Sequence, residues 1–505
     1  MTAHTQTILR NLGVMLHVPG LMAVVSLPVA WGFGETVVVA PLLWTALASF
    51  GVGQGLYWGC RRTETTRLHH AMLIAALSWL LVPFIGALPF WLTAQALASS
   101  QAPWSVLLFQ VPVNALFESF SGFTGTGLTM APKPSELLHT LQWWRSFMEW
   151  VGGVGVIVLM LSILKPTAGA YRLFYSEGRE EKIFPTVTST VRTIWWIYLL
   201  YTAFSIVLLL GLGMPWWAAI NHGMTGVSTG GFGITDNSIG DYDTLIKLGV
   251  LPIMLLGAIS FSMHYEVLRR RRWRALGEDA QHRLLWGFLL GGALLLWLEN
   301  WWFGQGHVVD TVFQWVSALT TAGFQTVNLH EWSPTAKLLL SLAMISGGAA
   351  GSTVGGLKLF RVMLLKQGLS WRFRRVRMKP DEVVAYKIDG RNLSEDEAYR
   401  VVEGASVLAS LWLVVLWVGI LMLIHLVPER FSLSDVILEV ASAQGNVGLS
   451  SGITDASLPP LAKIVLMVCM WVGRLEIIPV LIFLTAAYRA VRGRLKRTSA
   501  TARES

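Results

Sequence analysis

Residues 112–128 read PVNALFESFSGFTGTGL, an apolar run that opens with proline and leads into a loop of glycine and threonine. Proline is common in the first turn of a helix, so a helix is expected to start here. About ten residues make only ~15 Å of helix, which is half of the ~30 Å thickness of a bilayer core. The segment therefore predicts a helix that enters a membrane halfway and ends in the glycine loop Thr124-Gly125-Thr126-Gly127-Leu128.

The same combination occurs three more times along the chain. Residues 215–224 (PWWAAINHGM), 310–319 (DTVFQWVSAL) and 433–441 (LSDVILEVA) are the other half-length runs. Their loops are Val227-Ser228-Thr229-Gly230-Gly231, Thr320-Thr321-Ala322-Gly323-Phe324 and Gly445-Asn446-Val447-Gly448-Leu449. When Gly127, Gly230, Gly323 and Gly448 are aligned, the spacings are 103, 93 and 125 residues. This regularity indicates a fourfold internal repeat of span, half-helix, glycine loop and span.

The composition is that of a membrane protein. Charged residues make up 14% of the 505 residues, against about 25% in soluble proteins, and the mean hydropathy is +0.54. Ten apolar stretches are long enough to span a bilayer. They are approximately residues 11–33, 36–57, 71–92, 146–164, 193–210, 249–263, 284–302, 336–365, 407–426 and 462–488. The alternative for the first stretch is a signal peptide after Arg10, but the run is longer than a usual signal sequence and lacks an A-x-A end.

The positive charges predict the orientation. With the N-terminus assigned to the cytoplasm, 32 of the 39 Lys and Arg residues fall on the cytoplasmic side, as the positive-inside rule requires. The net charge of +9 is thus explained by topology, and we expect no nucleic-acid partner. Ten spans place both termini in the cytoplasm. The two cysteines, Cys60 and Cys469, exclude a disulfide framework and a cysteine-rich metal site.

Each repeat crosses the membrane twice, so all four have one orientation, and we expect pseudo-fourfold symmetry around one ion pore. Irregular backbone at membrane depth is tolerated only where it lines a cavity or is buried in protein. Glycine loops can turn their carbonyl oxygens toward a monovalent cation, and the C-terminal ends of the half-helices favour positive charge. The predicted selectivity filter consists of Thr124, Gly125, Thr126, Gly127, Ser228, Thr229, Gly230, Thr320, Thr321, Ala322, Gly323, Asn446, Val447 and Gly448.

Two alternatives concern these loops. One isolated loop of this kind is usually a surface turn, and the repetition in register favours the filter. The polar residues of the half-helices are either ion ligands or braces that hold the loops by hydrogen bonds, and bracing is favoured. These residues are Asn114, Glu118, Asn221, His222, Gln314 and Glu439.

Residues 347–358 read GGAAGSTVGGLK and interrupt the predicted span 336–365. Six glycines in twelve residues disfavour a continuous helix, because each costs roughly 0.8–1 kcal/mol relative to alanine. The segment resembles the GGxxGSTxGGxK stretch of the Trk/Ktr/HKT superfamily of potassium transporters, and the resemblance covers about residues 71–488. It implies an intramembrane gate loop, residues 347–356, under the filter. The alternative is a close-packing glycine patch between helices.

A second segment, residues 470–476 (MWVGRLE), is similar to the MWxGRLE segment of the same superfamily. A charge inside a span is costly and marks a pathway by default. The resemblance places Arg474 in the pore below the filter; the alternative is a structural ion pair with Glu476 or Glu149. The gate residues implied are Gly347, Gly348, Gly351, Ser352, Thr353, Gly355, Gly356, Lys358 and Arg474.

The two additional spans at the N-terminus favour the ten-span, TrkH-like bacterial branch over the eight-span Ktr-like subunits. Glycine at all four filter positions favours potassium, since serine at the first position is associated with sodium transport in plant relatives. The expected organisation is an all-α polytopic membrane protein. Its parts are 1–65, two N-terminal transmembrane helices; 66–185, pore repeat 1; 186–275, pore repeat 2; 276–395, pore repeat 3 with the gate loop 347–356; and 396–505, pore repeat 4 with a basic cytoplasmic tail.

The resulting prediction is potassium uptake across the cytoplasmic membrane, with potassium ions bound in the pore and no cofactor in this chain. The resemblance implies a homodimer in the lipid bilayer and a cytosolic, TrkA-like nucleotide-binding subunit. Residues 361–400 are a candidate docking surface for it, although positive-inside topology explains the same charges. The alternatives are a proton- or sodium-coupled symporter, a less selective Na/K permease and a membrane-embedded enzyme. No H-E-x-x-H motif, paired intramembrane aspartates or Ser/His constellation supports the enzyme.

Overall fold

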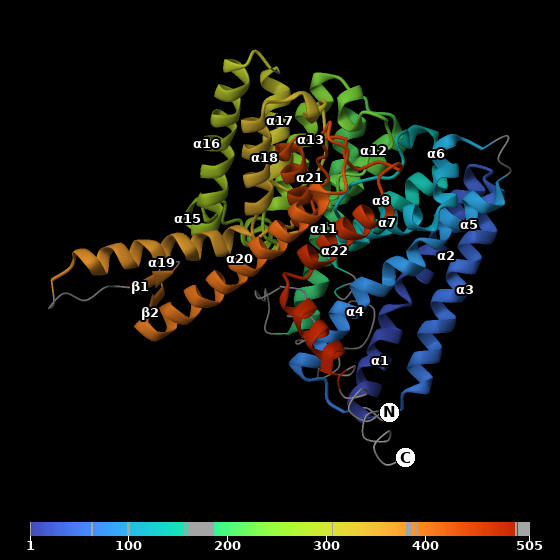
Figure 1. Ribbon diagram of the computed structural model, residues 1–505, viewed down its shortest axis with the longest axis horizontal. Helices are drawn as coiled ribbons and strands as arrows, with labels where there is room; N and C mark the ends of the chain where they lie inside the picture. The colour runs from blue at the N-terminus through green and yellow to red at the C-terminus, as the bar shows by residue number, and fades with distance from the viewer. Residues whose placement is uncertain are drawn as a thin grey trace.

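The computed structural model describes residues 2–61, 64–97, 102–155, 158, 186–305, 307–379, 386–388, 391–489 and 492. The chain is an all-α polytopic membrane protein, in which nearly every described element is a helix (Figure 1). Helices α19 (Leu359–Arg377) and α20 (Glu395–Ile424) extend from the main body as an arm. Some of the 32 predicted cytoplasmic charges lie outside the described residues: Arg62, Lys165, Arg172, Arg179, Lys182 and those of the tail beyond residue 492.

Six helical segments of the described residues are long and apolar enough to cross a membrane, and they match the first, second, third, fifth, seventh and ninth predicted spans. The N-terminal pair consists of α1 (Ala3–Met15) with α2 (Val18–Gly32), followed by α3 (Thr36–Gly59). The other four are α4 (Leu68–Gly86) with α5 (Leu88–Ala96), α11 (Val187–Gly211), α16 (Ala280–Trp302) and α20. Several of these helices start before the predicted apolar runs, because their first turns are polar.

The other four predicted spans are all interrupted. Helix α8 (His139–Val154) ends before Gly155, and α18 (Pro334–Ser346) ends before Gly347. Helix α13 (Thr244–Ala258) is bent by 106° from α14 (Phe261–Leu268). Helix α22 (Pro460–Arg474) is bent by 116° from the helix Ile478–Arg489.

The break at Gly347 confirms the predicted interruption, whereas the uninterrupted spans predicted over 249–263 and 462–488 are wrong. The span predicted over 146–164 stops being helical at Gly155, and its last residues lie outside the described part of the chain. The physical reason is close backbone packing. A Cβ atom at Gly152, Gly257 or Gly473 would lie no more than 3.0 Å from a carbonyl oxygen at the end of a half-helix. A hydropathy profile does not reveal where two backbone segments approach each other this closely.

The four half-length helices are confirmed. They are α7 (Pro112–Thr124), α12 (Trp216–Val227), α17 (Val308–Leu319) and α21 (Leu433–Gly445), with 12 or 13 residues each. Helix α6 (Trp104–Leu107) and the 3-10 helix η1 (Leu108–Gln110) precede α7 at a bend of 103°. Short 3-10 helices occur in three outer loops: η2 (Pro134–Glu136), η3 (Ser238–Asp241) and η4 (Leu329–Glu331).

The packing of the half-helices closes into a cycle. Each half-helix contacts the first span of its own unit and the helix that follows its own loop. It also contacts the second span of another unit. Helix α12 packs on α8, α17 on α13, α21 on α18, and α7 on α22. The last contact brings the end of the chain to its first half-helix, so the four units surround one centre.

One short element departs from the all-helical expectation. Strands β1 (Tyr386–Ile388) and β2 (Arg391–Leu393) pair antiparallel, with Tyr386 opposite Leu393. They lie between α19 and α20, beside a cluster of Trp371, Tyr386 and Ala398. Helix α15 (Ala275–Glu278) lies between α14 and α16.

Candidate ion pathway

The four glycine loops have the same backbone conformation. Each half-helix is followed, directly or after one residue, by a residue in the left-handed region: Gly125, Thr229, Thr321 and Asn446, with φ between 51° and 68°. The next residue donates its N–H back to a helix carbonyl: Thr126 to Ser121, Gly230 to Thr225, Ala322 to Ser317 and Val447 to Ser442, at 2.8–2.9 Å. The third residue is a glycine with positive φ: Gly127, Gly231, Gly323 and Gly448.

This comparison corrects the alignment of the second loop. The glycine that corresponds to Gly127 is Gly231, with φ of 89°, and not Gly230. Gly230 occupies the position of Thr126 instead, since both donate the same backbone hydrogen bond to their half-helix. The sequence alone did not distinguish them because the loop contains two adjacent glycines. The corrected spacings are 104, 92 and 125 residues.

The four aligned glycines form a closed ring of backbone contacts. A Cβ atom on Gly127 would lie closer than 3.0 Å to the carbonyl oxygen of Gly230. The same holds for Gly231 against Ala322, for Gly323 against Val447 and for Gly448 against Thr126. These oxygens belong to the residue just before the ring glycine of the adjacent loop. Glycine is thus required at each position for two reasons: φ is positive, and the neighbouring carbonyl oxygen leaves no room for a Cβ atom.

Polar side chains at the seventh residue of each half-helix are Glu118, His222, Gln314 and Glu439. Three of them hold the loop that leaves the ring. Glu118 accepts hydrogen bonds from Thr129 Oγ1 and the Met130 N–H at 2.8 and 2.7 Å. Gln314 donates to Thr326 Oγ1, and Glu439 accepts from residues 450, 451 and 454. His222 packs against Tyr242 and Phe324. These contacts agree with the bracing alternative.

A second ring of contacts lies nearer the start of the half-helices. The fourth residue of each interrupted helix is Gln142, Lys247, Lys337 or Lys463, and each contacts the first turn of a half-helix from another unit. The pairs are Gln142 with Trp217 at 2.8 Å, Lys247 with Asp310 at 3.2 Å, Lys337 with Asp435 at 2.6 Å and Lys463 with Asn114 at 2.6 Å. Lys247, Lys337 and Lys463 are among the seven Lys and Arg residues that are not counted on the cytoplasmic side. Their common fourth-residue position was the signal that the sequence offered.

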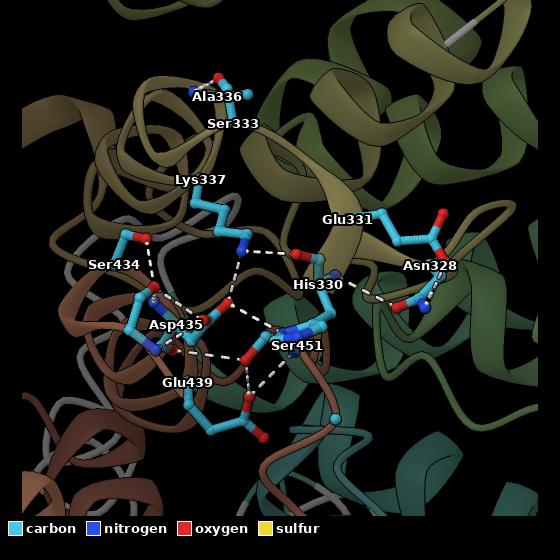
Figure 2. A network of polar contacts seen from close by, with 12 residues as sticks. Asn328, His330, Glu331, Ser333, Ala336, Lys337, Ser434, Asp435, Glu439 and Ser451 are labelled. Carbon is cyan, nitrogen blue, oxygen red and sulfur yellow. Dashed lines mark hydrogen bonds and ion pairs between the residues drawn. The ribbon is translucent and has the colours of Figure 1, made fainter. Parts of the chain in front are cut away.

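Figure 2 shows the most buried of these ion pairs. The Lys337 and Asp435 side chains are 5% and 1% exposed. Lys337 Nζ also donates to the His330 carbonyl oxygen at 2.7 Å, so the end of η4 is fixed to α18. Glu439 lies one turn further along α21 and accepts the Ser451 N–H at 3.0 Å. The network therefore connects α18, α21 and the loop after the fourth ring glycine.

The segment of residues 347–358, which contains the predicted gate loop 347–356, packs against the ends of the half-helices. Thr353 Oγ1 donates to the Gly257 and Val227 carbonyl oxygens at 2.9 and 3.1 Å. The Gly355 N–H donates to Thr321 Oγ1 at 3.0 Å. A Cβ atom on Gly355 would collide with the Gly445 carbonyl oxygen. The segment thus contacts the ends of three half-helices at once.

Arg474 lies in the same region. Its guanidinium donates to the Gly152 and Gly153 carbonyl oxygens, the latter at 3.3 Å, and lies 5.0 Å from the Trp79 ring. Glu476 pairs with Lys358 at 2.7 Å and with Arg361. Arg474, Gly355 and Asn446 line a cavity of about 30 Å³, which is large enough for a water molecule. Arg474 therefore lies beside both the predicted gate loop and the fourth glycine loop.

The remaining predicted residues lie at the ends of the half-helices, in the fourth glycine loop and between α18 and α19. The hydroxyls of Thr124, Ser228 and Thr320 bond back to carbonyl oxygens of their own half-helices and thereby cap them. Asn446 extends downward to Thr126 Oγ1 and the Met470 carbonyl oxygen. The loop between α18 and α19 contains the other predicted gate residues: Gly347, Gly348, Gly351, Ser352, Gly356 and Lys358. Trp79, on α4, was not predicted for this region.

Helices long and apolar enough to cross a membrane, together with four half-helices that end in converging glycine loops, define a polytopic membrane protein. A family model described as TrkH, cation transport protein, matches residues 43–296 and 304–489. The chain therefore belongs to the TrkH family of cation transport proteins. This is a family of transporters and not of enzymes.

Individual proteins agree with this assignment. The Trk system potassium uptake protein TrkH of Halomonas elongata is 32% identical, with 95% of this chain and 98% of that protein covered. An uncharacterised cation transporter of Methanocaldococcus jannaschii is 31% identical, with 95% of both covered. The crystal structure of the potassium transporter TrkH from Vibrio parahaemolyticus superposes with a TM-score of 0.80 at 28% identity, covering 95% of this chain and 98% of that one.

Proposed function

We propose that this protein takes up potassium across the cytoplasmic membrane through a filter formed by the four glycine loops. The single observation that supports this most strongly is the closed ring through Gly127, Gly231, Gly323 and Gly448. Carbonyl oxygens can replace the hydration shell of a potassium ion. The C-terminal ends of four half-helices add favourable negative potential. The named potassium transporters among the similar proteins support the choice of ion.

Below the filter, the gate loop and Arg474 form the closed state of the pathway. Hydrogen bonds of Thr353 and Gly355 hold the loop against the half-helices, and the charge of Arg474 repels a cation that has passed the filter. Opening requires the loop to leave these partners. Inward flow then follows the membrane potential, which contributes ~2.3 kcal/mol per charge for each 100 mV.

In this proposal, opening is controlled by a cytosolic nucleotide-binding subunit. It docks on the arm formed by α19, the strands β1 and β2, and α20. Arg375 on α19 pairs with Glu395 and donates to Tyr399 Oη at 2.7 Å, so the arm is internally braced while many of its basic side chains are exposed. Lipid headgroups are the competing partner for these charges. The homodimer and the cytoplasmic position of both termini are parts of the same proposal.

A coupled symporter is the second candidate. The observation that favours it is the half-buried cluster of Glu476 with Lys358 and Arg361 beside the gate loop. Ionisable groups inside a membrane are typical of proton and ion pathways.

The test is rubidium-86 uptake into liposomes that contain the purified protein and its cytosolic partner. Potassium or sodium is added as competitor, and wild type is compared with Gly127→Ser and Gly452→Ser. Gly452 is the matched control, because its φ of 86° resembles the 83° of Gly127 while no atom lies within 4 Å of its Cβ position. Both substitutions cause the same backbone strain, and only Gly127→Ser disturbs the ring.

We expect wild-type uptake that potassium blocks and sodium does not, with about tenfold weaker discrimination, or ~1.4 kcal/mol, in Gly127→Ser alone. If wild type takes up no rubidium, or if Gly127→Ser discriminates like wild type, the filter assignment fails. Proton or sodium movement in fixed ratio with rubidium would select the symporter.

A further inference from the structure

Three histidines converge where α1 and α4 begin, at the end of the molecule where the N-terminus lies (Figure 1). His69 Nε2 lies 3.4 Å from His4 Nδ1, and His70 Nε2 contacts the same His4 atom. One ring nitrogen from each residue lies within 4.8 Å of the others. Among the described residues, this is the one group of three or more His, Cys, Asp or Glu side chains close enough to hold a metal ion.

Helix geometry alone does not explain this convergence. His69 and His70 are consecutive in the first turn of α4, and consecutive side chains on a helix do not face each other. Both nevertheless turn toward His4, which is 65 residues away in the chain. The His4 and His69 rings are stacked, with centroids 4.8 Å apart, and the His70 ring meets His4 edge-on at 4.1 Å.

The scaffold around the cluster is preformed. The Glu64 N–H donates to Thr7 Oγ1 at 2.9 Å, and the Thr7 hydroxyl donates to the Ala3 carbonyl oxygen at 3.0 Å. These bonds hold the segment before α4 against the first turn of α1. His70 is fully buried, whereas His69 is exposed, so the cluster has one anchored ligand and one side open to solvent.

We propose that His4, His69 and His70 bind a divalent metal ion of the Zn²⁺ or Ni²⁺ type, which ties the first span to the first pore unit. Neutral imidazole is a preferred ligand of these ions. Zinc–nitrogen bonds of about 2.0–2.1 Å in a tetrahedral site place two ligand nitrogens about 3.3 Å apart, close to the observed His4–His69 separation. Water can supply the fourth ligand, because His69 is exposed to solvent.

Binding requires a change in hydrogen bonding. The Arg67 N–H donates to His70 Nδ1 at 3.2 Å, so without metal the proton of the His70 ring is on Nε2, directed toward His4. A metal ion replaces this proton, and Nδ1 becomes the protonated nitrogen. Arg67 is exposed, so its freed amide turns to water. For His70 the ring proton therefore only moves from Nε2 to Nδ1. Protons compete with the metal ion for the imidazole nitrogens, so binding weakens as the pH falls.

The experiment uses the full chain, purified with an affinity tag that contains no histidine and stripped with a chelator. Zn²⁺ and Ni²⁺ are titrated in competition with a chromophoric chelator, for wild type and for His4→Ala, His69→Ala and His425→Ala. His425, the exposed residue at the C-terminal end of α20, is the control. Thermal unfolding with and without Zn²⁺ is the second readout, because an ion that binds only the folded state raises the unfolding temperature.

We expect one ion per chain in wild type and His425→Ala, together with a raised unfolding temperature. In His4→Ala and His69→Ala the affinity falls at least tenfold, since even outer-shell partners of metal ligands typically contribute about 10–100-fold. Because His69 is exposed, His69→Ala retains the fold. If wild type binds no ion, or if the His69 and His425 variants bind alike, the cluster is a hydrogen-bonded contact only and the proposal is wrong.

Discussion

Gly230 and Gly231 are adjacent residues with different surroundings. A Cβ atom on Gly231 would meet the Ala322 carbonyl oxygen and the Gly323 backbone of the neighbouring loop, whereas one on Gly230 would meet the side chain of Glu149. Gly231 alone of the two also has positive φ. The backbone of a closed ring shifts less easily than one side chain. Gly231 therefore tolerates an added methyl group less well than Gly230.

We therefore predict that Gly231→Ala weakens the discrimination between potassium and sodium about tenfold, or ~1.4 kcal/mol, and that Gly230→Ala changes it much less. Competition of each cation with rubidium-86 uptake in liposomes measures both. Equal effects of the two substitutions, or a larger effect of Gly230→Ala, would place the second ring glycine at 230.

The Lys337–Asp435 pair is another residue-scale feature with a measurable consequence. Lys337→Met leaves the Asp435 carboxylate buried without its ammonium partner, and breaking a buried pair in this way typically costs about 3–5 kcal/mol. Lys247→Met serves as the comparison, since its pair with Asp310 is more exposed, at 15% and 13%. Thermal unfolding in detergent should show a larger loss for Lys337→Met, with partial recovery in Lys337→Met/Asp435→Asn. A loss no greater than that of Lys247→Met contradicts this assignment.

At the scale of elements, all four second spans break at the level where they meet the half-helices. Among the three breaks that have described helices on both sides, the one in the third unit is the longest, since twelve residues separate α18 from α19. Those residues contain the proposed gate loop, residues 347–356, which is attached to the half-helix ends by a few hydrogen bonds. One such bond contributes about 1 kcal/mol, so each is a small but measurable part of the closed state.

Thr353→Val removes a hydroxyl that bonds to the Gly257 and Val227 carbonyl oxygens while preserving the side-chain shape. We predict about fivefold higher rubidium flux without the cytosolic partner, corresponding to a loss of about 1 kcal/mol in the closed state. Ser346→Ala, which removes an exposed hydroxyl bonded within α18, is the control. Unchanged or lower flux in Thr353→Val would show that these bonds do not hold the pathway closed.

For the whole molecule, the charge distribution predicts which loops face the cytoplasm. Cys60 and Cys469 are both buried, so cysteines introduced at exposed sites can be labelled selectively. In sealed right-side-out vesicles, we expect an impermeant maleimide to label Glu429→Cys, in the outer loop after α20. We expect no labelling of Glu278→Cys, at the end of α15 on the predicted cytoplasmic side. Permeabilisation should expose the second site. Labelling of Glu278→Cys from outside would reverse the topology.

Much of the architecture could be predicted from local sequence. Apolar runs longer than a bilayer core are sufficient to identify spans, because burial in lipid depends on composition over about twenty residues. The half-helices, the glycine loops and the interruption at residues 347–358 likewise depend on short-range chemistry: proline at a helix start, and glycine where a helix cannot continue. The membrane class, the four repeats and most candidate filter residues follow from these patterns.

The tertiary structure was needed wherever distant backbones meet. It identified Gly231 as the second ring glycine, interrupted the spans at α8, α13 and α22, and paired Gln142, Lys247, Lys337 and Lys463 with other units. It also brought His4 to His69 and His70. In each case the determining quantity is the distance between residues tens to hundreds of positions apart. Local propensity and hydropathy carry no information about that distance, which is set by how the four units close around their common centre.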